Sequence, residues 1–251
     1  MSAVSELSLR RDPIRLLVSR GLWRSVWYLL GYLAVGWLLF AVALSTAVAG
    51  AGLSITFAGL PVLVAAAAAI RWCADVERAR LRAMVSGPVV GRYREVVGSG
   101  IMAQLRTRWR DPATWRDVAY LVGMFVPLLA LDAIVLAVWS VFLAGITLPI
   151  WYWAPWQTIH GVRYHGYDLG YHPNGPHGPG GWGLYVNTLP EAFAVAAVFL
   201  ILFLLFNYVL VATARAHVAV ARGLLGPAED PLREAKEVLG RPGPLSSNLR
   251  A

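Results

Sequence analysis

The chain has 251 residues, of which 58% are hydrophobic and only 14% are charged, and its mean hydropathy is +0.57. This composition excludes an ordinary soluble domain and indicates an integral membrane protein. The formal net charge of +8 would suggest nucleic-acid binding in a soluble protein, but here the basic residues stand beside apolar runs, where a topological role explains them, so we expect no nucleic-acid partner.

The first predicted element is an amphipathic helix on the membrane surface, within residues 1–25. Asp12 is a suitable N-cap, Pro13 suits the first helical position, and apolar residues follow at helical spacing. The stretch at 23–31, WRSVWYLLG, returns at 115–123 as WRDVAYLVG, with six of nine positions identical and Arg-Asp-Pro preceding it each time. We therefore predict an internal duplication, with a second interfacial helix before the second copy.

Residues 26–73 are predicted to form the first transmembrane hairpin. No charged residue occurs from 26 to 49, and about 20 apolar residues are enough to cross a bilayer core. The glycines Gly50 and Gly52 predict a tight reversal after this span. The second span then covers residues 53–70, with a kink or break at Gly59 and Pro61.

Residues 74–117 are predicted to be a cytoplasmic connection, which begins as a continuation of the second span through Val85 and is then broken into short pieces by glycine and proline. Residues 118–212 form the second hairpin, with spans at 118–143, interrupted by Pro127 and Asp132, and at 190–212. Between these spans, residues 147–188 form an extracytoplasmic insertion that is too polar to span and too long for a simple turn. Residues 213–251 form a cytoplasmic tail.

The basic residues orient this arrangement. In it, 21 of the 22 lysine and arginine residues fall on one side and only Arg163 on the other, which predicts a multi-pass protein of the plasma membrane with both termini in the cytoplasm. The fold class is therefore all-α: four transmembrane helices as two duplicated hairpins, plus interfacial amphipathic helices. Because Lys236 is the sole lysine and alanine is abundant, the composition suggests a high-G+C genome such as that of an actinobacterium.

Asp132 is the most informative single residue. It lies ~20 Å from the cytoplasmic end of its span, where an ionisable group is costly. One interpretation is a proton-sensitive or ligand-responsive switch; the other is a satisfied interhelical hydrogen bond, or a site that a partner helix covers. Thr56 lies at a similar depth and could donate a hydrogen bond to Asp132, whereas Asn207 is expected to be a helix-packing amide too near the inner end to reach it.

The insertion is expected to form an aromatic-rich extracytoplasmic cap, because amphipathic rings are favourable at the membrane interface. Its imidazoles could bind Zn or Cu or respond to pH, but no cysteine accompanies them and only Asp168 supplies a nearby carboxylate, so we predict no metal site and treat them as polar groups of the loop. The residues expected in this cap are Trp151, Trp153, Trp156, His160, His165, His172, His177 and Trp182.

No motif supports catalysis or a cofactor. The single cysteine, Cys73, excludes an intrachain disulfide and any multi-cysteine metal site. Residues 178–183 match G-x-G-x-x-G formally, but the dinucleotide fingerprint needs a preceding strand and a helix at its last glycine, and neither is expected in this loop. Phosphate-binding loops, H-E-x-x-H and G-x-S-x-G are absent from the sequence. We therefore predict a protein that is not an enzyme.

With these residues in view, the chain resembles the actinobacterial sensor-domain family, a four-helix membrane module often found N-terminal to histidine kinases. The most specific match is residues 111–117, DPATWRD, and shorter matches occur at 23–31, 59–61, 187–192 and 221–227. The resemblance implies a sensor-like membrane module. In kinase-linked relatives a phosphoacceptor histidine follows the last match, but here 24 residues follow it and none is histidine, so no kinase is expected in this chain.

These observations lead to two hypotheses. The first is a non-enzymatic accessory or regulatory subunit of a larger membrane complex, such as an envelope lipid or solute transporter, which acts through its transmembrane helices. The second is a stand-alone sensor that binds an extracytoplasmic ligand and signals to a separate histidine kinase or regulator. Both expect membrane lipid as a partner.

Overall fold

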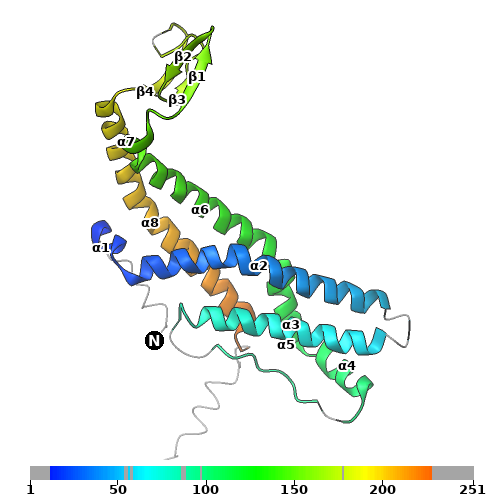
Figure 1. The fold of residues 1–251 in the computed structure, drawn as a ribbon. Coiled ribbons are helices and arrows are strands. Elements are labelled where there is room, and N and C mark those ends of the chain that lie inside the picture. The colour runs from blue at the N-terminus through cyan, green and yellow to red at the C-terminus, as the bar shows by residue number, and fades with distance from the viewer. Residues whose placement is uncertain are drawn as a thin grey trace, which may run out of the picture. The chain divides into compact units, whose positions relative to one another are not determined.

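A computed structural model describes residues 12–53, 56, 59–85, 89–96, 98–176 and 178–227, which form a mostly helical protein (Figure 1). Among these residues, four helices are long and apolar enough to cross a membrane: α2 (Arg20–Leu53), α3 (Gly59–Leu81), α6 (Phe125–Ile146) and α8 (Leu189–Leu225). This finding confirms the predicted fold class. The duplication and the domain boundaries stay predictions.

The chain divides into two compact units, which we describe separately. Unit 1 comprises Met1–Ala41, Arg82–Gly87 and Met124–Val220, and unit 2 comprises Val42–Leu81, Pro88–Gly123 and Ala221–Ala251.

A short capped helix accompanies each copy of the repeated stretch: α1 (Pro13–Leu17) ends before the first copy, whereas α5 (Pro112–Val118) includes the start of the second. The carboxylate of Asp12 accepts hydrogen bonds from the first turn of α1, and that of Asp111 does the same for α5, with proline at the helix start in each case. The indole of Trp23 donates to Leu17 O at 3.0 Å, and the indole of Trp115 donates to Trp109 O at 2.9 Å, six residues earlier in both copies. The repeated tryptophan therefore makes the same local contact twice.

The turn between α2 and α3 lies later than the sequence suggested. Helix α2 continues through Gly50 and Gly52 to Leu53, so the expected reversal at these glycines is wrong. A Cβ atom on Gly50 would lie 2.9 Å from the side chain of Leu63, so this glycine lets α2 and α3 approach closely. Helix α3 begins at Gly59 and has Pro61 in its first turn, where the missing N–H costs no helical hydrogen bond.

The connection after α3 runs back along that helix within unit 2. It contains α4 (Ile101–Trp109) and α5. Arg108 Nη1 donates to Val64 O at 3.2 Å and Trp109 Nε1 donates to Leu63 O at 3.0 Å, near the start of α3, whereas α5 contacts the second half of α3. The basic connection is therefore packed against α3 rather than extended away from it.

A π-helical turn, Ala119–Gly123, separates α5 from α6. Pro127 is the third residue of α6, so it starts this helix and does not interrupt it. In unit 1, α6 packs against α8, and a Cβ atom on Gly145 would lie 2.1 Å from the ring of Phe199. Helix α8 begins with a capping box, in which the carboxylate of Glu191 accepts from the backbone N–H groups of Asn187 and Thr188.

The insertion between α6 and α8 folds into strands that the sequence analysis did not predict (Figure 1). After α7 (Leu148–Trp151), two antiparallel pairs form, β1 (Trp156–Ile159) with β2 (Val162–His165) and β3 (Tyr167–Tyr171) with β4 (Trp182–Val186). His160 and Gly161 make the first turn with φ of 49° and 79°, the conformation that suits a two-residue hairpin. Leu148, Val186, Ala192 and Val195 form the core that fastens these strands to α7 and α8.

Candidate functional site

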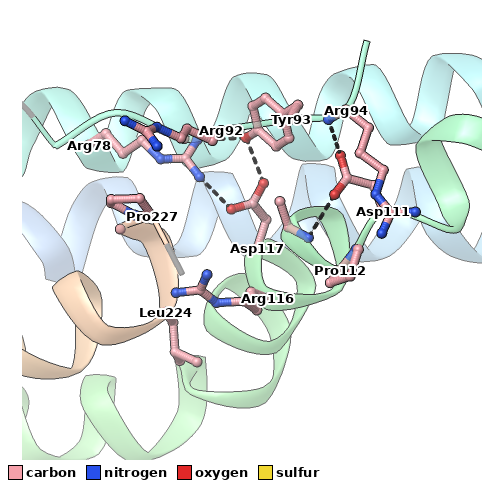
Figure 2. Close-up of a pocket in the computed structure, with 13 residues that line it drawn as sticks. Arg78, Arg92, Tyr93, Arg94, Asp111, Pro112, Arg116, Asp117, Leu224 and Pro227 are labelled. Atoms are coloured by element: carbon pink, nitrogen blue, oxygen red, sulfur yellow. Dashed lines mark hydrogen bonds and ion pairs between the residues drawn. The ribbon is translucent and has the colours of Figure 1, made fainter. Parts of the chain in front are cut away.

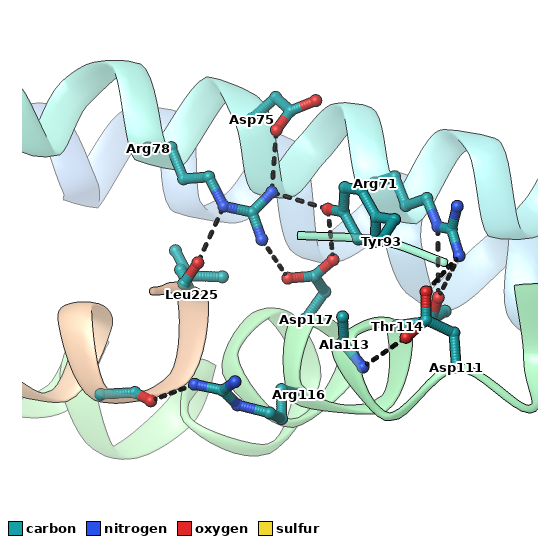
Figure 3. A network of polar contacts seen from close by, with 11 residues as sticks. Arg71, Asp75, Arg78, Tyr93, Asp111, Ala113, Thr114, Arg116, Asp117 and Leu225 are labelled. Carbon is teal, nitrogen blue, oxygen red and sulfur yellow. Dashed lines mark hydrogen bonds and ion pairs between the residues drawn. The ribbon is translucent and has the colours of Figure 1, made fainter. Parts of the chain in front are cut away.

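A buried arginine, Arg78 of α3, is the centre of a polar network in unit 2 (Figure 3). Its Nη2 lies 2.6 Å from Asp117 Oδ1, and its Nη1 donates to Tyr93 OH at 2.6 Å and to Asp75 Oδ1 at 2.8 Å. Its Nε donates to Leu225 O at 2.9 Å. All three guanidinium nitrogens are therefore engaged by α3, α5, the segment around Tyr93 and the end of α8.

Asp117 of α5 is the acidic partner of this arginine. Burial raises the pKa of Asp117 to about 6, although hydrogen bonding from Tyr93 and the charge of Arg78 oppose the shift. Burial also raises the pKa of Tyr93, so its phenol keeps its proton at neutral pH and donates to Asp117 Oδ2 at 2.7 Å. The network consequently contains one group that titrates near physiological pH and two donors that do not.

A second ion pair ties the start of α5 to α3. Arg71 Nη2 lies 3.1 Å from Asp111 Oδ2 and 2.9 Å from Thr114 Oγ1. Asp111 also accepts hydrogen bonds from the backbone N–H groups of Arg94 and Ala113, at 2.9 and 3.0 Å. The same carboxylate therefore caps α5 and fixes the extended segment before α4.

Two arginines also cap the C-terminal end of α8. Arg78 donates to Leu225 O, and Arg116 Nη2 donates to Gly223 O at 2.6 Å. The last carbonyl groups of a helix lack partners within the helix and carry its partial negative charge, so arginine side chains stabilise them. This contact holds the end of α8 in the network.

A pocket of 410 Å³ opens beside these groups (Figure 2). Its lining includes four arginines and two aspartates: Arg78, Arg92, Arg94, Arg116, Asp111 and Asp117. Sequence reasoning treated these arginines only as markers of topology, because their placement around one space depends on how the connection folds back.

A second polar site lies in unit 1, where Asp132 of α6 meets His217 of α8. The distance from His217 Nδ1 to Asp132 Oδ2 is 2.8 Å, and both residues are 0% exposed. The imidazole makes edge-to-face contacts with the rings of Tyr28 and Tyr32, at centroid distances of 5.2 and 4.4 Å. Asp132 Oδ1 is buried and accepts no hydrogen bond from the described residues. Helices of its own chain therefore cover this carboxylate.

The sequence analysis did not pair these two residues. It ended the last span at Ala212, whereas α8 continues to Leu225 and brings His217 to Asp132. Thr56 is exposed and donates to Leu53 O at 2.9 Å. Asn207 is buried, donates to Phe203 O and accepts from the indole of Trp139 at 3.0 Å.

The cap residues take different positions on the strands of the insertion. Trp151 packs against the core at the strand base, whereas Trp153, Trp156 and Trp182 are exposed. His172 Nδ1 lies 2.7 Å from Asp168 Oδ1 and His160 Nε2 lies 3.2 Å from Asn174 Oδ1, so the described histidines have separate surroundings. His165 is exposed at the end of β2, and His177 lies outside the described residues. Among the residues that the structure covers, no three His, Cys, Asp or Glu side chains gather as a metal site would require.

Comparison with protein-family models gives a match. The model of the family described as "Putative sensor" matches residues 28–225, which include both polar sites. No curated protein and no solved structure matches the chain. A sensor family suggests a role other than catalysis. Because the match covers most of the chain, this membrane protein belongs to the Putative sensor family.

Proposed function

We propose that this chain is a non-enzymatic, sensor-like regulatory subunit of a larger complex in the plasma membrane, with both termini in the cytoplasm. The candidate host is an envelope lipid or solute transporter, contacted through the transmembrane helices. The observation that carries the proposal is the buried pair Asp132–His217, which joins α6 to α8. An ionisable residue inside a membrane span is costly and by default marks a functional position.

The pair has the properties of a switch. Its carboxylate oxygen Oδ1 is buried without a hydrogen-bond partner among the described residues, and such a group is expensive to keep. A change in the protonation of either partner alters the attraction between α6 and α8, because the pair then gains or loses charge in a region of low dielectric constant. A partner that binds one packing of these helices would sense that change.

Affinity purification in mild detergents tests this function. We expect the wild-type chain to be recovered with other membrane proteins, and Asp132→Asn to reduce that recovery several-fold while the variant stays folded, since Asn keeps the shape of the side chain. Thr56→Val is the control, because Thr56 is exposed and, among the described residues, its hydroxyl bonds to a neighbouring carbonyl group alone. Recovery of the wild-type chain as a free monomer in every mild detergent would contradict the proposal.

A second candidate function is a stand-alone sensor that signals to a separate histidine kinase or regulator. The folded strands of the insertion favour it, because they present exposed aromatic side chains on a base that is packed against the first turns of α8. A ligand that binds the folded state raises its stability. Thermal-shift measurements with envelope lipids, Zn²⁺, Cu²⁺ and a pH step therefore test this function, and no shift with any of them would count against it.

A further inference from the structure

The pocket of unit 2 combines an excess of positive charge with few free acceptors. Its two carboxylates are already engaged: Asp117 accepts from Arg78 and Tyr93, and Asp111 accepts from Arg71 and two backbone N–H groups. A cation entering this space would find no carboxylate without a donor. The lining therefore favours an anion over a cation.

Three arginines supply the donors. The guanidinium groups of Arg92 and Arg94 are exposed and, among the described residues, make no hydrogen bond or ion pair. Arg116 donates from Nη2 to Gly223 O, and among the described residues its other guanidinium nitrogens make no hydrogen bond or ion pair. Figure 2 shows Arg116 across the opening from Arg78 and Arg92, with Leu224 and Pro227 at one side. An anion in the opening would thus be approached by guanidinium groups from α5 and from the extended segment.

We propose that this pocket binds a phosphate-bearing anion through Arg92, Arg94 and Arg116. Guanidinium groups match the oxygens of phosphate with paired, charge-assisted hydrogen bonds. The volume of 410 Å³ lies within the range of small-molecule sites, and it admits a phosphate together with the group that carries it. This binding site goes beyond the regulatory function proposed above, which is carried by Asp132 and His217 in unit 1.

Two sources of this chemistry are available, an anionic lipid headgroup and a soluble phosphate. The charge-free part of α3 ends at Ile70, and Arg78 lies ~12 Å further along the helix axis. If α3 crosses the bilayer, Arg78 lies ~29 Å along the axis from Gly59, at the inner edge of the ~30 Å hydrocarbon core and next to the headgroups. The experiment therefore needs a lipid probe and a soluble one.

The binding of two probes to the full-length chain in detergent separates the sources. Dihexanoyl phosphatidylglycerol is the lipid probe, with dihexanoyl phosphatidylcholine as its zwitterionic reference. Inorganic phosphate is the soluble probe, with chloride at equal ionic strength as its reference. Selective binding of phosphatidylglycerol alone assigns the pocket to a lipid headgroup, and binding of inorganic phosphate assigns it to a soluble ligand. Binding of neither probe would overturn the proposal.

A double variant, Arg92→Gln with Arg94→Gln, locates the binding. We expect the affinity to fall at least about tenfold, since each lost charge-assisted hydrogen bond contributes on the order of that factor. The matched control is Arg106→Gln with Arg110→Gln, which removes the same charge from exposed arginines of the same connection outside the pocket. Equal affinity in the two double variants would overturn the proposal. Both should unfold at the wild-type temperature, because these side chains are exposed.

Just after Pro227, the sequence contains the acidic pair Glu229 and Asp230, which is a competing occupant. A chain truncated after Pro227 tests it. If the truncated and full-length chains bind the probe with similar affinity, the pocket serves an external anion, as proposed. If binding is detected only after truncation, the tail is the occupant and the proposal is wrong.

Discussion

At the residue scale, the chemistry of unit 2 depends on Asp117, an acid placed among donors. Two of its contacts, with Arg78 and Tyr93, favour the charged form, yet burial dominates and raises its pKa. Ser25 occupies the same position in the first copy of the repeat and is also buried, but within the part of the chain that the structure describes it bonds to the backbone of Gly21 in its own helix and to no other residue. This position of the sequence repeat thus faces inward in both copies, and the second copy carries the charge.

The stability of unit 2 should depend on pH through Asp117. Its pKa is about 6 in the folded chain against a usual value of 3.8, so the folded state binds more protons between these values. The free energy of unfolding should therefore fall as pH rises from about 4 to about 6, by ~3 kcal/mol in total. Denaturant titrations of wild type and Asp117→Asn measure this. The pH dependence should be weaker in the variant, and identical profiles would contradict the assignment.

A second prediction concerns Gly91, which lies against the guanidinium of Arg78. A Cβ atom at this position would be 2.6 Å from Arg78 Cζ, and this guanidinium cannot move away without breaking its hydrogen bonds to Asp117 and Leu225. Gly91→Ala should reduce the free energy of unfolding by ~1–3 kcal/mol. Gly52→Ala is the control, because a Cβ atom there meets open space; an equal loss in both variants would exclude this explanation.

Single residues were predicted with uneven success for a physical reason. Asp132 could be recognised from the sequence because a carboxylate in an apolar run is visible by itself. Its partner His217 lies 85 residues away, beyond the charge-free part of the last span, and no local pattern links the two. The same holds for Arg78 and Asp117, which are 39 residues apart. Long-range polar pairs depend on the fold and cannot be recovered from spacing.

At the element scale, apolar periodicity and N-caps located the helices better than glycines did. The Asp-Pro steps at 12–13 and 111–112 start helices as expected. Gly50 and Gly52 were assigned to a turn, although glycine in a long apolar helix can instead permit close helix contact. The hairpin of β1 and β2 was missed because its turn, His160-Gly161, has a histidine where the common hairpin signals have Asn or Asp.

Gly145 makes a testable contact between α6 and α8. The ring of Phe199 occupies the space of its missing side chain, with Cδ1 2.1 Å from the position of a Cβ atom. Gly145→Ala should therefore force the helices apart and cost ~1–3 kcal/mol of unfolding free energy. Gly223→Ala in α8, where a Cβ atom has open space, should be neutral or slightly stabilising. Thermal unfolding in detergent compares the two, and an equal effect would show that the Phe199 contact is not responsible.

At the scale of the whole molecule, composition and hydropathy were sufficient to predict a four-helix membrane protein, because burial in lipid imposes long apolar helices. They were not sufficient to predict how the connection folds. Arg108 and Trp109 lie beside the start of α3, and Asp117 bonds to Arg78 near its other end. If α3 crosses the membrane, its two ends lie on opposite sides. A connection that contacts both ends then cannot lie wholly in the cytoplasm, where the sequence analysis placed it.

Topology mapping tests directly whether α3 crosses the membrane. In a Cys73→Ala background, single cysteines at Thr56, Ser99, His165 and Ser246 report the side on which each segment lies. Four crossings with cytoplasmic termini predict that Thr56→Cys and His165→Cys react with an impermeant thiol reagent, whereas Ser99→Cys and Ser246→Cys react only after the membrane is permeabilised. If Thr56→Cys behaves like Ser99→Cys, α3 does not cross the membrane, and its packing against α4 would explain why.

The arginine cap at the end of α8 has a mechanical consequence. Arg78 and Arg116 donate hydrogen bonds to its final carbonyl groups, and the helix ends immediately before Gly226 and Pro227. Because two side chains hold the last turn of α8, a rotation of this helix would strain their hydrogen bonds before it reached the residues after Pro227. We therefore expect movement of α8 to be felt first at the guanidinium groups of α3 and α5.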